Sequence, residues 1–419
     1  MPTPTLHPVP PTAAGPASRR RIVGTVGVAS AAGALLISGC AATTNSVSAP
    51  PSASFPSTES STVAHIVTKD NAGAFISPAL QSGRIFVAQS KSGGAIMSWQ
   101  LSDLPKSGST SPVVVAPTDS FTPDMSSNAK MEQIAFTPNN SSIYISKKAI
   151  KSGQGGANSV WEYDWNSNQT KGSGTNLAGL PEPGGDGSQA WPGNNAQAAI
   201  DYTYAPGHFP KPDGSTTPTK VAIGNGGGVT EAGNGYLYFG SLQSGCVYKQ
   251  NPKTSQTWAI YCIPSWGANN QNQSIYSLDN DKRGNVYAIY QGSTDNNTII
   301  LKITPGGAGQ TSDKIQAIQL QGWARSIGLA VNEDGSTIFA NGTSMAQYNQ
   351  ANTNTLLQVD SPTWGTPEAP TAVTPKATEI AAIGTTPWLT GIGLLDKGGD
   401  KGDRVYIADN TSGFWIVYL

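Results

Sequence analysis

The stretch that decides the fold is Gly233 to Pro264, which reads GNGYLYFGSLQSGCVYKQNPKTSQTWAIYCIP. Short polar turns separate three apolar and aromatic runs in it, namely Tyr236 to Phe239, Cys246 to Tyr248 and Trp258 to Ile263. Short runs of this composition, bounded by turn residues, are typical of β-strands in a meander. The stretch therefore predicts one complete unit of consecutive antiparallel strands.

The first strand of this unit begins with an apolar-aromatic-apolar triplet, and the triplet recurs along the chain. A small or polar turn precedes each copy. The copies are Ile85-Phe86-Val87, Ile143-Tyr144-Ile145, Leu237-Tyr238-Phe239, Val286-Tyr287-Ala288, Ile338-Phe339-Ala340 and Val405-Tyr406-Ile407. The steps between the central aromatic residues are 58, 94, 49, 52 and 67. Four-stranded propeller blades repeat every 40 to 50 residues or so, which is close to the shorter steps.

Six copies predict an all-β, six-bladed β-propeller, because units that cannot bury their apolar faces alone must stack on their neighbours. The step of 94 residues leaves room for a seventh blade or for a long insertion at about residues 166–220. We expect the short strand within 62–68 to pair with the last strand, Phe414 to Leu419, and so to close the ring. A β-sandwich with coincidental hairpins is the competing fold.

The repeat resembles that of NHL-type and gluconolactonase-like propellers, carried here by IGLAVNEDGSTIFA and GDRVYIADNTSGFWIVYL over about residues 60–419. The resemblance lies in the pattern of the repeat, so it implies a fold more strongly than an activity. Gluconolactonase-like propellers hold a divalent metal such as Ca²⁺ at the channel. The residues that would supply its carboxylate and amide ligands here are Glu132, Asn225, Glu231 and Asp279.

The N-terminus predicts an exported, lipid-anchored protein. Three arginines, Arg19 to Arg21, precede an apolar run from Ile22 to Ile37, as in a signal peptide. The run ends in Ile37-Ser38-Gly39-Cys40, which resembles a bacterial lipobox, and this resemblance implies that Cys40 carries the lipid. An ordinary signal peptide that ends near a cysteine is the alternative. Both the Sec and the twin-arginine export routes stay open.

This interpretation divides the chain into three parts. They are a signal peptide at 1–39, the acylated Cys40 with a flexible tether rich in Ser, Thr, Pro and Ala at 40–61, and the propeller at 62–419. The expected partner of the mature chain is the cell membrane, to which palmitate-type chains on Cys40 attach it. The expected location is therefore extracytoplasmic.

The two other cysteines, Cys246 and Cys262, lie on either side of the turn NPKTSQ. They are equally distant from the middle of this turn, so they should face each other across adjacent strands. In an oxidising compartment they are expected to form a structural disulfide.

Large aromatic residues predict one face of the ring as a ligand-binding face. The repeat places five tryptophans in connections between successive blades, where Arg325 would also reach the channel mouth; they are Trp191, Trp266, Trp323, Trp364 and Trp388. Rings beside amide and hydroxyl groups suit a neutral, polyhydroxylated ligand such as a glycan. The alternative is that these tryptophans wedge neighbouring blades together.

Composition and motifs narrow the function classes. Only 12% of the residues are charged and the net charge is −1, which argues against a nucleic-acid partner. No nucleophile elbow, zinc-protease or P-loop motif is present in the sequence. The leading hypothesis is a surface-anchored module that binds a glycan or a protein and needs no cofactor. The alternatives are a metal-dependent hydrolase or lactonase, and a scaffold for a membrane complex.

Overall fold

The fold was analysed in a computed structural model of the chain. The structure describes residues 63–68, 75–91, 93–123, 129–137, 142–149, 159–164, 171–172, 174–176, 199–202, 219–222, 226–242, 245–254, 256–262, 274–291, 297–309, 311–347, 355–380, 389–395, 404–411 and 413–419.

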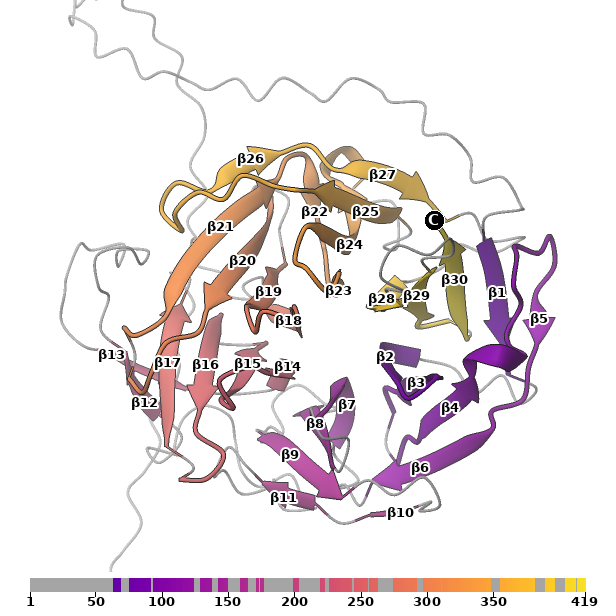
Figure 1. Ribbon diagram of the computed structural model, residues 1–419, viewed down its shortest axis with the longest axis horizontal. Coiled ribbons are helices and arrows are strands. Elements are labelled where there is room, and N and C mark those ends of the chain that lie inside the picture. The colour runs from indigo at the N-terminus through magenta and orange to yellow at the C-terminus, as the bar shows by residue number, and fades with distance from the viewer. Residues whose placement is uncertain are drawn as a thin grey trace, which may run out of the picture. The chain divides into compact units, whose positions relative to one another are not determined.

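Six antiparallel sheets stand in a ring, with one edge strand of each sheet at the centre, and form a six-bladed β-propeller (Figure 1). From the inner to the outer strand, blade 1 contains β2 (Phe75–Gln81), β3 (Arg84–Gln89), β4 (Ile96–Gln100) and β6 (Asp119–Pro123). Blade 2 contains β7 (Ala129–Phe136), β8 (Ser142–Ala149), β9 (Ser159–Asp164) and β11 (Gly174–Asn176). Blade 3 contains β14 (Gly226–Glu231), β15 (Leu237–Ser241), β16 (Cys246–Gln250) and β17 (Thr257–Cys262).

Blade 4 contains β18 (Ile275–Asn280), β19 (Val286–Tyr290), β20 (Thr298–Thr304) and β21 (Lys314–Leu320). Blade 5 contains β23 (Leu329–Val331), β24 (Thr337–Ser344), β25 (Thr355–Asp360) and β27 (Lys376–Glu379), and β22 (Trp323–Ala324) prolongs its inner edge. Blade 6 contains β28 (Leu389–Leu395), β29 (Arg404–Asp409), β30 (Phe414–Tyr418) and β1 (Val63–Val67). Two 3-10 turns, η1 (Leu101–Asp103) and η4 (Met345–Gln347), complete the elements named here.

The repeated triplet marks the same strand in every blade. All six copies lie in the second strand, which is sandwiched between two others and is therefore the most deeply buried position of a blade. This explains why the triplet is the clearest part of the repeat in the sequence.

The ring closes as predicted, with the first strand of the chain in the last blade. β1 runs antiparallel to β30, and Val63 faces Val417 while His65 faces Trp415. The imidazole and indole rings of this second pair stack with 4.1 Å between their centroids. Three strands from the end of the chain and one from its beginning thus share one sheet, which leaves no open seam.

The long step between blades 2 and 3 does not add a blade in the part of it that the structure describes. β12 (Ala199–Tyr202) and β13 (Thr219–Ala222) pair only with each other and form a separate two-stranded ribbon. Six blades, rather than seven, therefore account for the described strands.

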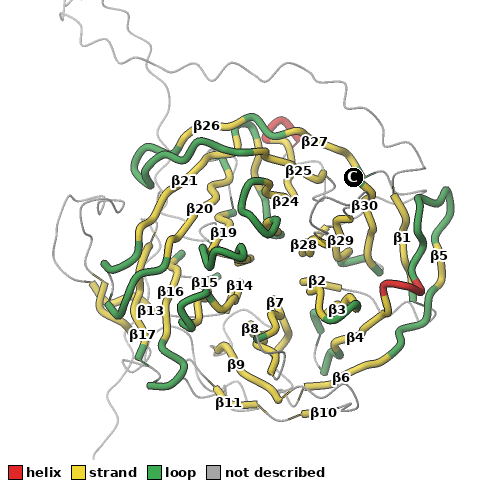
Figure 2. The backbone as a smooth tube through the Cα atoms, in the orientation of Figure 1, coloured by secondary structure: helices red, strands yellow, loops and turns green. Residues whose placement is uncertain are grey.

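Three blades carry a fifth strand on the outer rim. β5 (Val113–Val114), β10 (Lys171–Gly172) and β26 (Thr371–Val373) pair in parallel with β1, β6 and β21, respectively. Each lies in the chain between the third and fourth strands of the following blade (Figure 2). These additions cover edges that would otherwise offer unpaired backbone groups.

The hydrophobic core consists of six separate clusters, one at each junction between neighbouring blades. At the junction of blades 3 and 4 a charged pair is buried as well. Lys249 Nζ lies 2.8 Å from Asp313 Oδ1, and neither side chain is exposed to solvent. The contacts that hold the ring together are therefore mostly contacts between blades.

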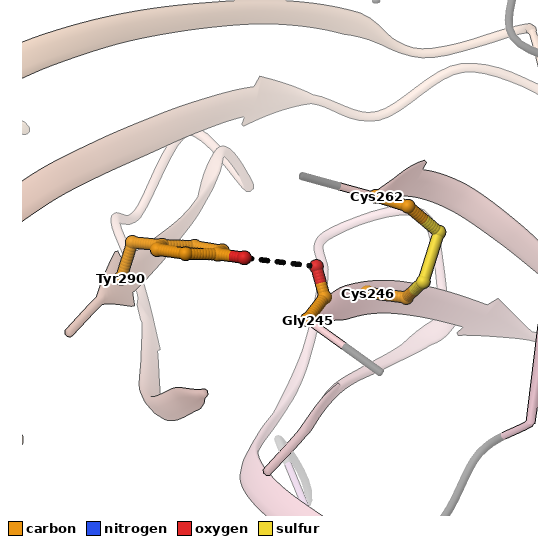
Figure 3. The surroundings of a disulfide bond; sticks show 4 residues. All are labelled: Gly245, Cys246, Cys262 and Tyr290. Carbon is orange, nitrogen blue, oxygen red and sulfur yellow. Dashed lines mark hydrogen bonds between the residues drawn. A yellow bond between two sulfur atoms is a disulfide. The ribbon is translucent and has the colours of Figure 1, made fainter. Parts of the chain in front are cut away.

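The predicted disulfide is present. Cys246 and Cys262 are directly opposite each other on β16 and β17, with their Cα atoms 4.1 Å apart. Beside them, the Tyr290 hydroxyl of blade 4 donates a hydrogen bond to the carbonyl oxygen of Gly245 (Figure 3). The bond therefore closes the third and fourth strands of blade 3 next to its junction with blade 4.

We expect the double variant Cys246→Ser, Cys262→Ser to lose about 3 kcal/mol of unfolding free energy, because a loop of this length constrains the unfolded chain by roughly that amount. Urea denaturation of the variant, and of the wild type with and without reductant, measures the loss. The reduced wild type should match the variant. A variant as stable as the oxidised wild type would contradict a stabilising role.

Candidate ligand site at the channel mouth

The inner strands of the ring are irregular at one common level. The β-ladder of five of them shifts register, at Ile76/Pro78, Met131/Gln133, Gly226/Val229, Ile275/Ser277 and Leu389/Ile392. In blade 5 the inner edge is interrupted between β22 and β23. Bulges turn side chains out of the regular alternation and are frequent next to functional sites.

A cavity of about 450 Å³ lies where these irregularities meet. Its walls include residues at the bulges of blades 1, 2, 4 and 6 and the ends of three second strands; the lining residues used below are Ser77, Ser90, Lys130, Glu132, Gln133, Tyr276, Ser277, Gln291, Arg325, Thr390 and Asn410. The inner strands contribute their N-terminal halves, so the cavity is the channel mouth on the side of the connections between blades. We call it the upper cavity.

Two residues of the upper cavity have backbone conformations that side chains rarely adopt. Ser77 has φ 50° and Arg325 has φ 54°, both in the left-handed region. Such conformations are unfavourable by about 1 kcal/mol or more, and they persist where the surrounding structure requires them. At Ser77 the requirement is visible, because its hydroxyl accepts a hydrogen bond from the amide of Ile134 in the next blade.

Gln133 ties three inner strands together below the upper cavity. Its Oε1 accepts hydrogen bonds from the amides of Val229 in blade 3 and Leu278 in blade 4, each at 3.0 Å. Its Nε2 donates to the carbonyl oxygen of Leu278 at 2.6 Å. A Cβ atom on Gly228 would lie 2.5 Å from Gln133 Oε1 and 2.2 Å from the amide nitrogen of Leu278. Only glycine therefore allows the amide of Gln133 to cross blade 3.

The walls of the upper cavity include polar residues and carry both signs of charge. Lys130 Nζ lies 4.0 Å from Glu132 Oε1 on blade 2, and Arg325 comes from blade 5, on the opposite side of the ring. Thr390, on blade 6, is held in place because its hydroxyl donates 2.7 Å to the carbonyl oxygen of Phe75. Charged residues, residues with a hydroxyl group and Tyr276 thus line one space.

The predicted tryptophan face is not supported by the two members that the structure describes. Trp323 does precede an inner strand, but it is only 7% exposed and packs in the cluster between blades 4 and 5. The assignment of Trp364 was wrong. This residue lies between the third and fourth strands of blade 5, and therefore on the face of the propeller opposite to the predicted one. The centroid of its ring is 5.9 Å from that of Tyr287. Both act as wedges between blades. Trp191, Trp266 and Trp388 lie outside the described residues.

The carboxylates of the alternative metal site do not converge. Glu132 lines the upper cavity, whereas Glu231 and Asp279 lie near the other end of their inner strands. Glu231 accepts a hydrogen bond from the Tyr144 hydroxyl at 2.8 Å, and burial raises the pKa of its carboxyl. Asn225 lies outside the described residues. Among the described residues, no three His, Cys, Asp or Glu side chains come together as a metal site.

Asp279 instead joins blades 4 and 5. Its Oδ2 accepts a hydrogen bond from the amide of Val331 at 2.7 Å, and its Oδ1 accepts one from the amide of Asn280. Burial raises the pKa of the Asp279 carboxyl to about 7, although both of these hydrogen bonds lower it. An unfolded aspartate has a pKa of about 3.9, so between about pH 4 and pH 7 the folded protein binds a proton that the unfolded chain does not.

The protein should therefore gain stability at this position as the pH falls from about 7 towards 4. Relative to Asp279→Asn, which cannot titrate, we expect the wild type to gain on the order of 2 kcal/mol between pH 8 and pH 5. Parallel unfolding free energies of the two proteins over this range, measured by urea denaturation, would contradict the expectation.

A second cavity, of about 700 Å³, opens at the other mouth of the channel and is called the lower cavity. Turns between the first and second strands line it, and its lining residues used below are Ser102, Arg84 and Lys282. It shares no lining residue with the upper cavity. Arg84 lies 3.7 Å from Asp119 in an ion pair of its own blade.

Most of the upper cavity was missed by sequence reasoning, which named Arg325 and Glu132 but not Ser77, Tyr276 or Thr390. The usable signal was the broken alternation at the start of each inner strand, as in FISPAL, KMEQIAF and LTGIGLL. A bulge places two consecutive residues where regular alternation allows one. The resulting break in the alternation of apolar and polar residues cannot be interpreted until the strand pairing is known.

The segment that carries the predicted lipid anchor, including Cys40, lies outside the described residues. In the part of the chain that is described, none of the helices has the length and apolar character needed to cross a membrane.

No model of a protein family matches the chain, and no curated protein sequence is significantly similar to it. Solved structures that are similar include a Trichoderma reesei carbohydrate-active enzyme of family AA12, at 11% identity over 87% of this chain and 98% of that one, with a TM-score of 0.49. They also include virginiamycin B lyase from Staphylococcus aureus, at 12% identity over 84% and 97% of the two chains, with a TM-score of 0.46. At these identities and TM-scores the likeness says nothing of activity or ligand.

Proposed function

We propose that this protein is a lipid-anchored, extracytoplasmic binding protein whose ligand, the end of a cell-wall or extracellular glycan, occupies the upper cavity. The observation that carries the proposal is the coincidence of bulges in the inner strands of blades 1, 2, 4 and 6, and an interruption in that of blade 5, around one cavity. Described residues of five blades thus line the site, and it replaces the tryptophan face as the candidate surface.

The chemistry of the upper cavity suits a polyhydroxylated ligand. Ser90, Ser277, Gln291 and Asn410 offer hydroxyl and amide groups that both donate and accept hydrogen bonds. The ring of Tyr276 offers an apolar surface on which a pyranose can stack. A cavity of about 450 Å³ is in the usual range for small ligands and admits one or two sugar units rather than a whole chain.

Filling the cavity tests the proposal. We expect Ser90→Trp, at the rim of the upper cavity, to abolish binding of soluble cell-wall oligosaccharides in calorimetric titrations of the full-length protein. The matched control is Ser102→Trp, which places the same ring at the lower cavity and should leave binding unchanged. Equal binding by both variants, or no binding by the wild type, would overturn the proposal.

The anchoring rests on the N-terminal sequence, and the disulfide agrees with an oxidising compartment outside the cytoplasm. We expect Cys40→Ser to prevent acylation and to move the protein from the membrane fraction to the soluble fraction, since several acyl chains on one residue are needed for durable attachment. Cell fractionation and labelling with an alkyne fatty acid measure both effects. A Cys40→Ser protein that stays labelled and membrane-bound would contradict the lipid anchor.

A further inference from the structure

Resting on the proposed function, we propose that the ligand of the upper cavity is an acidic sugar, a uronic acid or a similar carboxylate-bearing unit, whose carboxylate binds the guanidinium of Arg325. The described side chains that line the cavity include two cations, Lys130 and Arg325, and one anion, Glu132. The whole chain has a net charge of −1, so the two cations in this wall do not reflect a basic chain.

The two cations lie on different sides of the cavity. Lys130 lies next to Glu132 on the same strand, with 4.0 Å between Nζ and Oε1, so that pair is close to neutral as a unit. Arg325 lies on blade 5, across the mouth from blade 2. A ligand that spans the cavity therefore meets Arg325 on one side and the Lys130–Glu132 pair on the other.

The chemistry of these two sides matches one class of sugar. A planar guanidinium binds a carboxylate through two parallel hydrogen bonds, a geometry that a lysine cannot reproduce. On the other side, the carboxylate of Glu132 accepts hydrogen bonds from sugar hydroxyls, and the ammonium of Lys130 donates to them. A hexuronate carries its carboxylate at one end of the ring and hydroxyls at the other, so both sides of the cavity can be satisfied at once.

The backbone at Arg325 adds an independent argument. Its φ of 54° lies in the region that favours glycine, yet the residue is an arginine in the interruption between β22 and β23. Its main chain is fixed by its neighbours, because Ser326 Oγ accepts a hydrogen bond from the Thr298 hydroxyl at 2.9 Å and Asn341 Oδ1 accepts one from the amide of Ile327 at 2.9 Å. Arg325 thus holds a strained backbone conformation at the wall of the cavity, as expected of a binding residue.

The test compares two probes that differ only in the carboxylate, methyl β-D-glucuronoside and methyl β-D-glucoside, in calorimetric titrations of the full-length protein in detergent. We expect the wild type to bind the glucuronoside at least tenfold more tightly, and Arg325→Gln to remove that difference while affecting the glucoside less than twofold. Arg325→Lys should retain part of the preference for the glucuronoside, because it keeps the positive charge but loses the planar guanidinium that makes two parallel hydrogen bonds. Added salt should weaken the binding of the glucuronoside but not that of the glucoside.

The matched control is Arg84→Gln, which removes an arginine from the lower cavity and should preserve the preference. Equal affinity of the wild type for both probes would overturn the acidic-sugar inference while leaving the proposed saccharide site standing. Loss of the preference in Arg84→Gln but not in Arg325→Gln would overturn the assignment to the upper cavity. If neither probe nor any cell-wall oligosaccharide binds, the proposed function fails as well.

Discussion

Replacing Lys249 by methionine should destabilise the protein by roughly 3–5 kcal/mol, because removing one partner of a buried ion pair leaves the other charge without compensation. Lys249 Nζ donates hydrogen bonds to Asp313 Oδ1, to the carbonyl oxygen of Gly307 and to Ser312 Oγ, at 2.7 to 2.8 Å. All three acceptors lie on the turn between the third and fourth strands of blade 4, whereas Lys249 is on blade 3.

The ring supplies its own control for this prediction. Lys302 occupies the equivalent position in blade 4, opposite Tyr287 as Lys249 is opposite Tyr238, and its Nζ also lies over aromatic rings. No carboxylate ion pair is found for Lys302 among the described residues. Lys302→Met should therefore lose less than about 1 kcal/mol. Equal losses for the two lysine variants in urea denaturation would show that the buried pair is not what stabilises this junction.

Replacing Gln133 by leucine should destabilise the protein by roughly 4 kcal/mol, since three backbone groups in two blades lose their partner at once and each such loss is worth about 1–3 kcal/mol. The groups are the amides of Val229 and Leu278 and the carbonyl of Leu278. Gln133→Glu keeps the hydrogen-bond acceptor but loses the donor, so it should lose less unfolding free energy than Gln133→Leu. The free energy of unfolding in urea is the measurement.

Gln291→Leu is the control for this substitution, because Gln291 lines the same cavity and, among the described residues, no hydrogen bond joins its side chain to another blade. Its expected loss is below about 1 kcal/mol, as is usual for a partly exposed side chain. If Gln133→Leu were as mild as Gln291→Leu, the three hydrogen bonds would not be what holds the inner strands of blades 2, 3 and 4 together.

The features that were correctly predicted from the sequence are local ones. The triplets lie in the second strand of each blade because that strand is buried on both sides, and burial leaves a continuous apolar run. The Cys246–Cys262 bond followed from the position of the turn between two adjacent strands. Closure by the first strand followed from the need to cover the last edge.

The features that were missed depend on pairing between distant segments. Trp364 was placed on the wrong side because the connection that carries it contains the extra strand β26, which pairs with the preceding blade. The ion pair joins residues of different blades, and the bridge from Gln133 to Leu278 passes over a third. The local sequence contains no signal for such partners, because the packing of the blades determines which residues meet.

The central claim is that the inner strands build one ligand site at the upper mouth of the channel. A diffraction structure of crystals soaked with methyl β-D-glucuronoside tests it most directly. The account predicts the sugar in the upper cavity, with its ring on Tyr276 and its carboxylate on Arg325. Density for the sugar in the lower cavity beside Arg84 and Lys282, or on the outer rim, with the upper cavity free of sugar, would contradict it.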